Sequence, residues 1–396
     1  MKKKHKILFI QPIKSFSGSL KSSEEYIKNL YKKYSFIFLT QHGFSSKILG
    51  KYGKIFTSFG ISKFDNTENS RYIGLRWLLL GREIIYLPFT LLNLLLIKLT
   101  VKEIDLIHLN EITGLPTAII AKLIFKKPLI VHVRSLNYKN KKKFISKLHF
   151  NLLNKFSDKI LAIDNNVLKT VSIKNKSVVL RNILDFKMQS FKKVSKNKKF
   201  LTIGYIGSYL KYKGLGNLII AVQNLVDKGI ELKLVTAGSI IKRNFVFEKI
   251  FKGLNLDNNI DRNFLNKKFI KDLGFISNVQ KFYNKIDVLC FPSSLNTTGR
   301  QIFEAGFFYK PVILCLKKKN CDGFIERYNG ISYKNFNSTK QLQNSIIIFY
   351  RNRKLINAMG MNGKKLATKN HSKNLNIEKL KSIYNDLITK AKYKKK

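Results

Sequence analysis

Short apolar runs alternate with stretches of helical periodicity in the first half of the chain. The runs predict buried strands, and the stretches at 22–33 and 116–125 predict helices between some of them. The predicted strands are 7–10, 35–40, 106–109, 129–133 and 159–163. Because strands that alternate with helices form parallel sheets, this half predicts a doubly wound α/β domain.

A second series of the same kind follows a polar, lysine-rich segment at 185–199. It comprises predicted strands at 201–206, 232–237, 273–275, 288–291 and 312–316, a helix at 216–228, closing helices over 333–347, and an amphipathic stretch at 375–391. We expect an N-terminal Rossmann-like domain at 1–184, a linker at 185–199 and a second Rossmann-like domain at 200–372. The terminal helix, 373–396, is expected to pack back on the first domain. Two such domains are expected to face each other across a ligand-binding cleft.

Composition excludes a disordered chain but leaves the meaning of the charge open. The 396 residues are 44% hydrophobic and carry a formal net charge of +52. One interpretation is an anionic partner, either nucleic acid or an acidic membrane face. The other is compositional drift, because the lysines are scattered and form no single stripe. No recognised nucleic-acid-binding motif accompanies the charge, so nucleic acid is the weaker candidate.

Cysteine usage and the N-terminus predict a cytoplasmic protein. Cys290, Cys315 and Cys321 do not have the spacing of a structural zinc site and indicate a reducing compartment. The apolar core at 7–10 is too short for a signal-peptide core and fits a first strand better.

The segment 84–99 is the strongest apolar run and has two interpretations. It is short for a transmembrane span and contains Pro88 and Asn93. A buried helix packed on the sheet is the first interpretation. The second is a helix lying on the inner face of the cytoplasmic membrane, with Arg76, Arg82 and Lys98 meeting anionic headgroups.

Residues 286–313 carry the most specific chemical signal. An apolar run reaches Pro292, a polar loop ends at Gly299, a helical stretch carries Glu304, and a second apolar run follows. This order places amides and hydroxyls at the carboxyl end of a strand, where parallel α/β sheets bind ligands.

This segment resembles the donor-site motif of family 4 glycosyltransferases, which have the GT-B fold. The family pattern is Pro-Ser-x-x-Glu-x-x-Gly-x-x-x-x-Glu-Ala, followed by Gly-x-Pro-Val-Ile. Here residues 292–305 read Pro-Ser-Ser-Leu-Asn-Thr-Thr-Gly-Arg-Gln-Ile-Phe-Glu-Ala, and Lys-Pro-Val-Ile follows at 310–313. The resemblance covers nearly the whole chain and is strongest at 202–220 and 274–313.

The resemblance implies roles for residues of the second domain. Glu304 would accept hydrogen bonds from the ribose hydroxyls of the donor nucleotide, because one carboxylate can accept from two vicinal hydroxyls. Asn296 stands where the family usually has a first glutamate near the donor sugar. The remaining residues implied in donor binding around this helix are Thr297, Thr298, Gly299 and Arg300.

A second patch, 206–214, resembles the family loop after the first strand of this domain. Gly207 is followed at the family spacing by Lys213-Gly214, and Ser208 stands where the family often has arginine. Lys213 would neutralise the charge that builds up on the leaving diphosphate.

In the first domain, Gly18 and Ser19 resemble a glycine loop near phosphate or acceptor, with an ordinary serine-rich loop as the alternative. His132 matches the family histidine beside the acceptor and donor sugar, with a structural histidine as the alternative. Arg134 would contact phosphate or acceptor.

The resemblance therefore implies a retaining transferase that moves a sugar from a nucleoside-diphosphate sugar to a glycan or lipid-linked acceptor in cell-surface polysaccharide or lipopolysaccharide synthesis. No metal or other cofactor is expected, because lysine and helix amides take the phosphate charge. The alternatives are a catalytically weak GT-B protein that binds membrane or nucleic acid, and a nucleotide-sugar epimerase. The sequence leaves the donor sugar, base and acceptor open.

Overall fold

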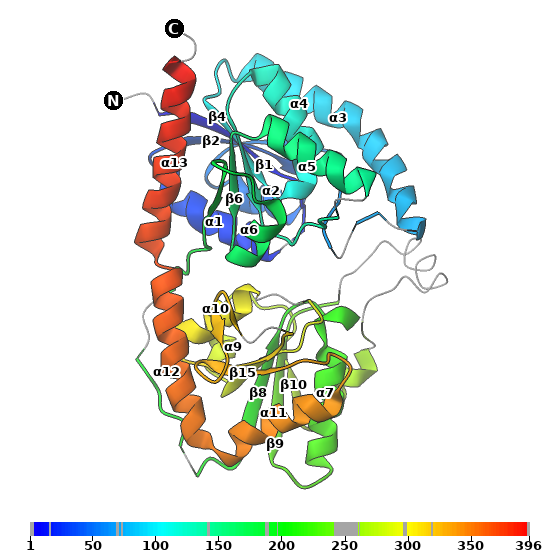
Figure 1. The fold of residues 1–396 in the computed structure, drawn as a ribbon, viewed down its shortest axis with the longest axis vertical. Coiled ribbons are helices and arrows are strands. Elements are labelled where there is room, and N and C mark those ends of the chain that lie inside the picture. The colour runs from blue at the N-terminus through cyan, green and yellow to red at the C-terminus, as the bar shows by residue number, and fades with distance from the viewer. Residues whose placement is uncertain are drawn as a thin grey trace. The chain divides into compact units, whose positions relative to one another are not determined.

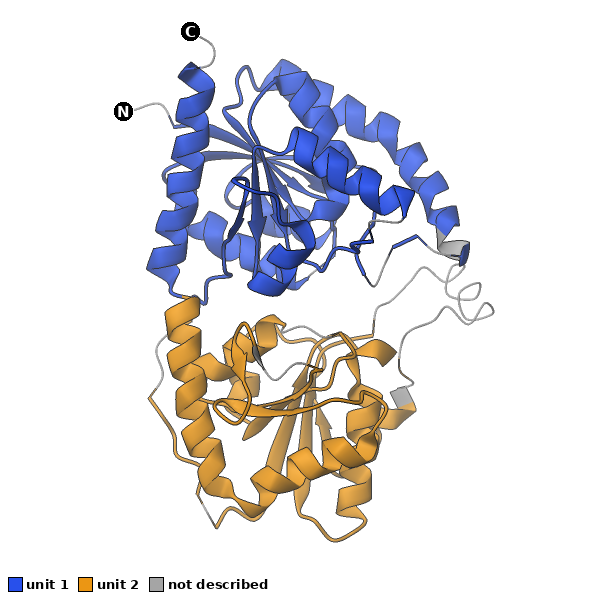
Figure 2. Ribbon diagram, in the orientation of Figure 1, with its two compact units in different colours: residues 1–185, 372–396 blue, residues 186–371 orange. Residues whose placement is uncertain are grey.

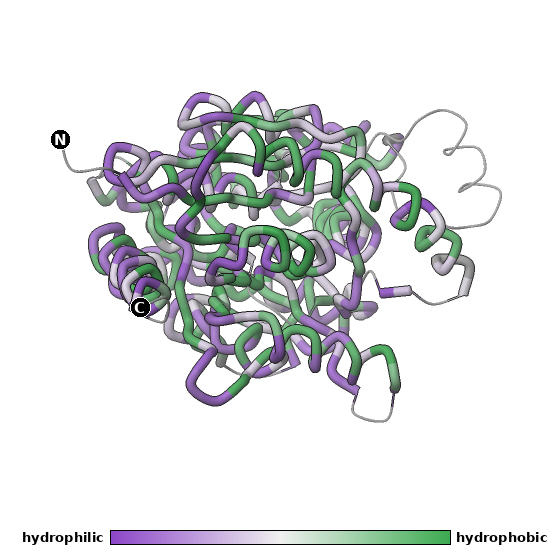
Figure 3. The backbone as a smooth tube through the Cα atoms, turned by 90° about the horizontal axis from the view of Figure 1, so that it is seen from above, coloured by the Kyte–Doolittle hydropathy of each residue, from purple (hydrophilic) through white to green (hydrophobic). Residues whose placement is uncertain are grey.

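The computed structural model describes residues 4–393 apart from 16, 69–70, 73, 141–142, 187–189, 196, 241–259, 261, 296–298 and 318–319. These residues form two compact units (Figure 2). One comprises residues 1–185 and 372–396, and the other comprises 186–371. Hydrophobic stretches alternate with hydrophilic ones along the backbone, as the sequence pattern predicts (Figure 3).

The first unit is built on a parallel sheet of seven strands in the order β3-β2-β1-β4-β5-β6-β7 (Figure 1). The strands are β1 (Lys6–Gln11), β2 (Ser35–Gln41), β3 (Gly53–Ser58), β4 (Leu106–Asn110), β5 (Leu129–Val133), β6 (Lys159–Ala162) and β7 (Ser177–Val179). In the β4–β5 pair, Asn110 lies opposite His132.

Helices cover both faces of this sheet because alternate strand residues enter different cores. One core joins the strands to α3 (Leu78–Thr100), α4 (Leu115–Phe125), α5 (Phe144–Phe156) and α6 (Asn165–Val171). The other joins them to α1 (Gly18–Leu30), α2 (Phe44–Leu49) and the terminal helix α13 (Lys373–Tyr393). Short 3₁₀ turns, η1 (Gly74–Trp77) and η2 (Ile112–Gly114), precede α3 and α4.

The second unit repeats the architecture with a six-stranded parallel sheet, β10-β9-β8-β11-β12-β15. The strands are β8 (Leu201–Ile206), β9 (Leu232–Ala237), β10 (Ile270–Asp272), β11 (Val288–Phe291), β12 (Val312–Cys315) and β15 (Gly330–Tyr333), beside a small antiparallel pair of β13 (Asn320–Cys321) and β14 (Phe324–Ile325). The helices and 3₁₀ turns are η3 (Lys211–Lys213), α7 (Leu215–Val226), η4 (Arg262–Leu265), α9 (Gln280–Tyr283), α10 (Arg300–Phe307), α11 (Thr339–Arg351) and α12 (Arg353–Asn370).

Several sequence expectations differ from the structure. The strand expected at 273–275 lies at Ile270–Asp272, and the closing helices expected from 333 begin only at Thr339, because Gly330–Tyr333 is a strand beside β12. In the segment expected to be a linker, Val194 packs against the second core, and its amide donates to Asn357 Oδ1 at 2.8 Å.

The apolar run 84–99 is helical, but it is not the buried helix of the first interpretation. Within α3, the buried residues are Glu83, Thr90, Leu94 and Ile97. Most of its other apolar side chains are exposed, among them Ile85, Leu92 and Leu99.

Candidate functional site

Three chain segments form the candidate donor site at the carboxyl ends of β8 and β11. After β8 the chain turns at Gly207, whose amide donates to the Ala237 carbonyl at 3.0 Å. The Tyr205 hydroxyl donates to the carbonyl of Ser208 at 2.9 Å, which fixes the loop that follows. The loop amides therefore lie where a parallel sheet presents ligand-binding groups.

Lys213 ends the short turn η3, and Gly214 is the N-cap of α7. Gly214 has φ +79°, and a Cβ there would lie 2.1 Å from the Pro292 carbonyl oxygen, so this close approach requires glycine. Burial lowers the pKa of Lys213 to about 8. No described carboxylate forms an ion pair with it, and its Nζ lies 5.6 Å from the centroid of the Phe291 ring.

The N-terminus of α10 meets the same aromatic ring. Gly299 caps this helix without a side-chain hydrogen bond, and a Cβ there would lie 3.1 Å from Phe291 Cζ. A Cβ at Gly207 would lie 3.8 Å from Gln301 Nε2 on the first turn of α10. Gly207, Lys213 and the start of α10 are thus brought together around Phe291 and Gln301. This arrangement offers a cation and helix amides to an anionic group.

Glu304 lies one turn into α10, and both of its oxygens have partners. Arg300 Nε donates to Oε1 at 2.6 Å, and the Tyr283 hydroxyl donates to Oε2 at 3.1 Å. Burial and the neighbouring carboxylate raise the pKa of Tyr283 well above its ordinary value, so the hydroxyl keeps its proton. A carboxylate has about four lone-pair sites, so Glu304 keeps the capacity to accept further hydrogen bonds.

The predicted residues Asn296, Thr297 and Thr298 lie outside the described residues. Ser294 precedes them in the chain, and its backbone amide donates a hydrogen bond to the Tyr212 carbonyl at 2.9 Å.

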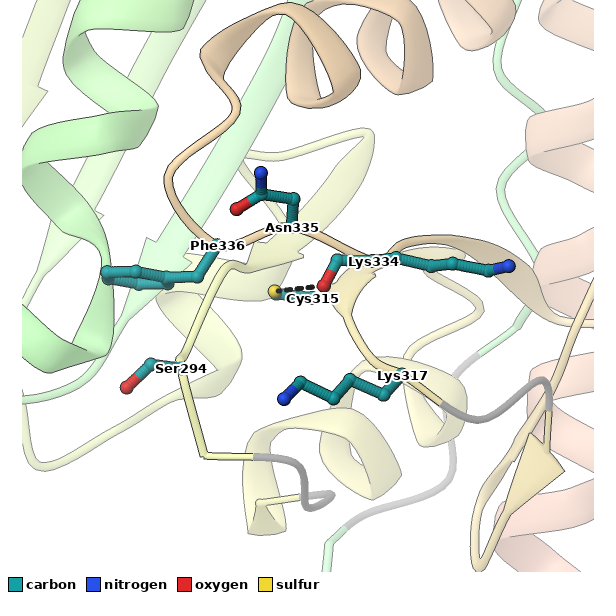
Figure 4. Close-up of a pocket in the computed structure, with 6 residues that line it drawn as sticks. All are labelled: Ser294, Cys315, Lys317, Lys334, Asn335 and Phe336. Carbon is teal, nitrogen blue, oxygen red and sulfur yellow. Dashed lines mark hydrogen bonds between the residues drawn. The ribbon is translucent and has the colours of Figure 1, made fainter.

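A pocket of about 450 Å³ opens beside Ser294, at the ends of β11, β12 and β15 (Figure 4). Its lining residues are Ser294, Cys315, Lys317, Lys334, Asn335 and Phe336. The Lys317 side chain extends toward Ser294, whereas that of Lys334 points away. None of the described residues predicted for donor binding lines this pocket, so the pocket is adjacent to the predicted contacts and does not contain them.

In the first unit, His132 and Arg134 lie in a polar network at the ends of β4 and β5. Arg134 donates through Nε to Asn110 Oδ1 at 2.6 Å and through Nη1 to Asn182 Oδ1 at 2.8 Å. Its Nη2 lies 3.3 Å from His132 Nδ1. The Asn110 amide in turn donates to Gln11. The network holds the half-buried guanidinium in one orientation.

The Arg134 contact determines the tautomer of His132. A guanidinium has only donors, so Nδ1 of His132 must accept and the ring proton must be on Nε2. Burial, Arg134 and His108 lower the pKa of His132 well below its ordinary value. His132 is therefore a neutral hydrogen-bond donor, and its Nε2 is buried without a hydrogen-bond partner among the described residues.

The His132 ring is 1% exposed and lies beside a cavity of only about 10 Å³. Arg134 is more exposed, so the geometry favours Arg134 as the group that meets a ligand and His132 as a group that positions it. The predicted Gly18 and Ser19 form the first turn of α1, where Ser17 caps the helix by accepting from the Leu20 amide at 3.2 Å.

Sequence reasoning missed three residues of these two networks. Tyr283 donates to Glu304, and Gln301 lies beside Gly207. In the first unit, Tyr384 of α13 places its hydroxyl 2.6 Å from His108 Nδ1. The His108 ring centroid is 5.6 Å from that of His132. Burial and Arg134 lower the pKa of His108 to about 3. Across the described residues, no three His, Cys, Asp or Glu side chains are grouped as metal ligands.

Comparison with known proteins supplies an independent finding. Residues 186–366 match the family described as glycosyl transferases group 1. A 192-residue stretch is 26% identical to the capsular polysaccharide biosynthesis glycosyltransferase CapM of Staphylococcus aureus, covering 48% of each chain. The match thus spans about half the length of that relative.

Solved structures resemble the whole chain. Anabaena Alr3699/HepE in complex with UDP and glucose has a TM-score of 0.72 at 17% identity, over 97% of this chain and 100% of that one. A glycosyltransferase from Rickettsia africae has a TM-score of 0.69 at 17% identity, over 97% and 99%. Sucrose-phosphate synthase from Thermosynechococcus elongatus has a TM-score of 0.70 at 13% identity, over 98% and 100%. At these identities the likeness establishes the fold.

Proposed function

We propose that this chain, whose residues 186–366 form a domain of the glycosyl transferases group 1 family, transfers a sugar from a nucleoside-diphosphate sugar to a glycan or lipid-linked acceptor. Its two Rossmann-like units have the fold of its structural neighbours, which are GT-B glycosyltransferases. The family 4 assignment, retention of anomeric configuration and action in surface-polysaccharide synthesis belong to the proposal. The similarity to CapM and the complexes of HepE with UDP and glucose support it.

The observation that carries the proposal is the grouping of Lys213, the Gly207 loop and the N-terminus of α10 around Phe291. In the transfer, the acceptor oxygen bonds to the anomeric carbon while the bond from that carbon to the diphosphate breaks. The acceptor proton passes to the departing diphosphate, whose negative charge grows as the bond breaks. A lysine with helix amides stabilises that charge more in the transition state than in the ground state.

Glu304 is proposed to bind the donor ribose, as the motif implies. The contacts from Arg300 and Tyr283 fix the rotamer of its carboxylate, so the acceptor atoms are positioned before the nucleotide binds. In the first unit, Arg134 is proposed to contact phosphate or acceptor, with His132 beneath it as a neutral partner.

The test is a panel of UDP-, GDP- and ADP-sugars offered to the purified full chain, with thermal shift and sugar release as readouts. A ligand that binds the native state alone raises the melting temperature, by an amount that depends on its concentration relative to Kd. We expect one nucleotide class to stabilise the protein and to be hydrolysed slowly without acceptor. Lys213→Met and Glu304→Gln should remove both effects.

Matched controls lie in the same unit, at the exposed Lys228 and the partly exposed Glu231. Lys228→Met and Glu231→Gln change the charge equally without touching the candidate site. If no nucleotide sugar binds, or if the site variants behave like these controls, the transferase assignment fails. Binding without hydrolysis or transfer would instead favour the catalytically weak alternative.

A further inference from the structure

The α3 helix has an apolar surface that the described residues of the first unit do not cover. Its buried residues Glu83, Thr90, Leu94 and Ile97 fall on one narrow stripe. Within the described residues, α3 is the only helix that is long and apolar enough to cross a membrane, with a mean hydropathy of 1.5 and 22% of that window buried. Length and composition alone do not distinguish a membrane helix from a core helix. The two cases differ in whether the apolar side chains of α3 are buried in the unit or exposed on its surface.

Exposed apolar side chains gather opposite the buried stripe. At about 100° per residue, they occupy an arc of about 120° that is centred away from the unit. This α3 apolar face is defined by Ile84, Ile85, Leu92, Leu95, Leu96 and Leu99, which are 42–81% exposed. From Ile84 to Leu99 it extends about 23 Å along the helix axis. An exposed apolar surface of that length marks an interaction site.

The buried stripe fixes α3 lengthwise against the first unit. Glu83 Oε2 accepts from the Lys63 amide at 2.9 Å, and the Thr90 hydroxyl accepts from the Ser62 amide at 3.0 Å. Leu94 and Ile97 belong to the core shared with the sheet. A helix attached along its length cannot cross a bilayer without breaking these contacts. It can lie in the plane of the membrane surface with its opposite face in the lipid.

Charge around the face fits an anionic lipid surface. Residues 84–97 contain no charged side chain, while the basic residues Arg82 and Lys98 lie on the two flanks of the apolar arc. Lys98 is exposed, and Arg82 forms an ion pair with the buried Glu83 but keeps half of its side chain exposed. Long basic side chains at such positions reach the headgroups while their stems stay in the apolar layer. A second copy of the chain is a poorer occupant, because two molecules of net charge +52 repel each other.

Aromatic side chains stand at the N-terminal end of the face. Trp77, the single tryptophan of the chain, immediately precedes α3 and is 39% exposed. Phe59 is exposed beside the helix, with its ring centroid 5.3 Å from that of Phe89. Aromatic residues at the border of an apolar surface are typical of the membrane interface.

We propose that the α3 apolar face inserts into the interfacial layer of a bilayer containing anionic lipid, with α3 lying parallel to the surface. This goes beyond the proposed transferase activity and does not depend on it. If both hold, the acceptor is processed at the membrane surface.

Vesicle flotation of the full chain tests the proposal without any sugar donor. Phosphatidylcholine vesicles with and without phosphatidylglycerol are compared. We expect flotation with the anionic vesicles and a blue shift of Trp77 emission, quenched by brominated lipid. A triple variant, Ile85→Ser with Leu92→Ser and Leu99→Ser, should lower vesicle partitioning about tenfold or more, since each substitution removes an apolar side chain from the lipid.

The matched control replaces exposed apolar residues elsewhere, as Ile220→Ser with Ile348→Ser and Leu375→Ser. It should float like the unmodified chain. Lys98→Gln with Lys102→Gln should reduce the preference for anionic vesicles, and Lys228→Gln with Lys267→Gln should not. Because all these side chains are exposed, circular dichroism should show unchanged folding.

Three results would overturn the proposal. The first is that the full chain floats with neither kind of vesicle and light scattering shows that it forms a dimer, which the α3 triple variant does not form. That result would assign the α3 apolar face to self-association. Another is equal flotation of the α3 variant and its control. The third is a protein that resists alkaline carbonate extraction from membranes, which would indicate a spanning helix.

Discussion

Arg300 donates through Nε to Oε1 of Glu304 across one turn of α10, at 2.6 Å. Both side chains are largely buried, at 10% and 7% side-chain exposure, so the pair is well shielded from water. Tyr283 donates to the other oxygen of the same carboxylate. The carboxylate predicted from its motif position to bind ribose is thus also the centre of a buried polar cluster.

This arrangement predicts separable effects on stability and on donor binding. Tyr283→Phe removes the hydroxyl that lies 3.1 Å from both Glu304 Oε2 and the Gln301 carbonyl oxygen, and should lower the free energy of unfolding by about 1 kcal/mol. Glu304→Ala leaves Arg300 without its carboxylate partner and should cost about 3 kcal/mol. Chemical denaturation measures both values. The double variant should cost clearly less than the sum of the single variants, and strict additivity would show that Tyr283 and Glu304 are not coupled.

Lys213 predicts a loss of donor affinity at alkaline pH. Because burial lowers its pKa to about 8, the free protein loses this cation as pH rises through about 8. The KM for the donor should therefore rise above that pH, while kcat changes less, since bound diphosphate keeps the lysine protonated. Lys213→Arg should move the rise to higher pH. A KM that is flat to pH about 10 would show that Lys213 does not hold the diphosphate.

The lowered pKa of Lys213 also determines whether its contribution to the free energy of unfolding rises or falls with pH. Between pH about 8 and 10.5 the unfolded chain keeps a proton on this lysine and the folded chain does not. The contribution of Lys213 to the free energy of unfolding therefore rises with pH over that window, and Lys213→Met should remove this rise.

Gly214 and Gly229 form a matched pair for testing the approach of α7 to Pro292. Both have φ +79°, but a Cβ at Gly229 meets no atom of the described residues within 4 Å, whereas one at Gly214 would lie 2.1 Å from the Pro292 oxygen. Gly229→Ala should cost about 1 kcal/mol of stability through backbone strain alone. Gly214→Ala should cost about 3 kcal/mol or more and should also weaken donor binding. Equal costs measured by thermal unfolding would contradict this contact.

Buried histidines predict sensitivity to acid. Burial lowers the pKa of His108 to about 3 and that of His149 to about 4, and His132 is also lowered. As pH falls below about 6.5 the unfolded chain takes up protons that the folded chain does not, so stability is lost at about 1.4 kcal/mol per pH unit for each such histidine. Urea unfolding at several pH values measures the slope. His149→Gln should reduce the slope of the free energy of unfolding against pH by about 1.4 kcal/mol per pH unit, the contribution of one histidine.

The strand-and-helix alternation was sufficient to predict the class of fold, because buried parallel strands are nearly continuous apolar runs. It missed β3 and β7, whose residues are only partly buried and therefore lack such a run. It also could not place α3, because an apolar run has the same composition whether it faces a core or lipid. Only the folded structure shows which side chains of α3 are buried against the first unit, Glu83 and Thr90 among them, and which apolar side chains are exposed.

For the candidate site, motif spacing located Lys213 and Glu304 but not their partners. Tyr283 and Gln301 reach the site through the folding of α9 and α10 together. Tyr283 lies outside the motif, and Gln301 stands at a motif position where the family pattern specifies no residue type. Tyr384 is 276 residues from His108, so no local pattern relates the two. Contacts of this kind depend on tertiary structure, so a single sequence contains no local pattern that predicts them.

The division of the first unit into residues 1–185 and 372–396 has a consequence for synthesis on the ribosome. The segment 186–371 is translated as one uninterrupted piece and can fold as soon as it emerges. The first unit must wait, because Ile377, Leu380 and Tyr384 complete a core shared with α1 and β1. Until residues 373–393 have been translated, one face of its sheet is without α13, and the nascent chain exposes an apolar surface that a chaperone can recognise.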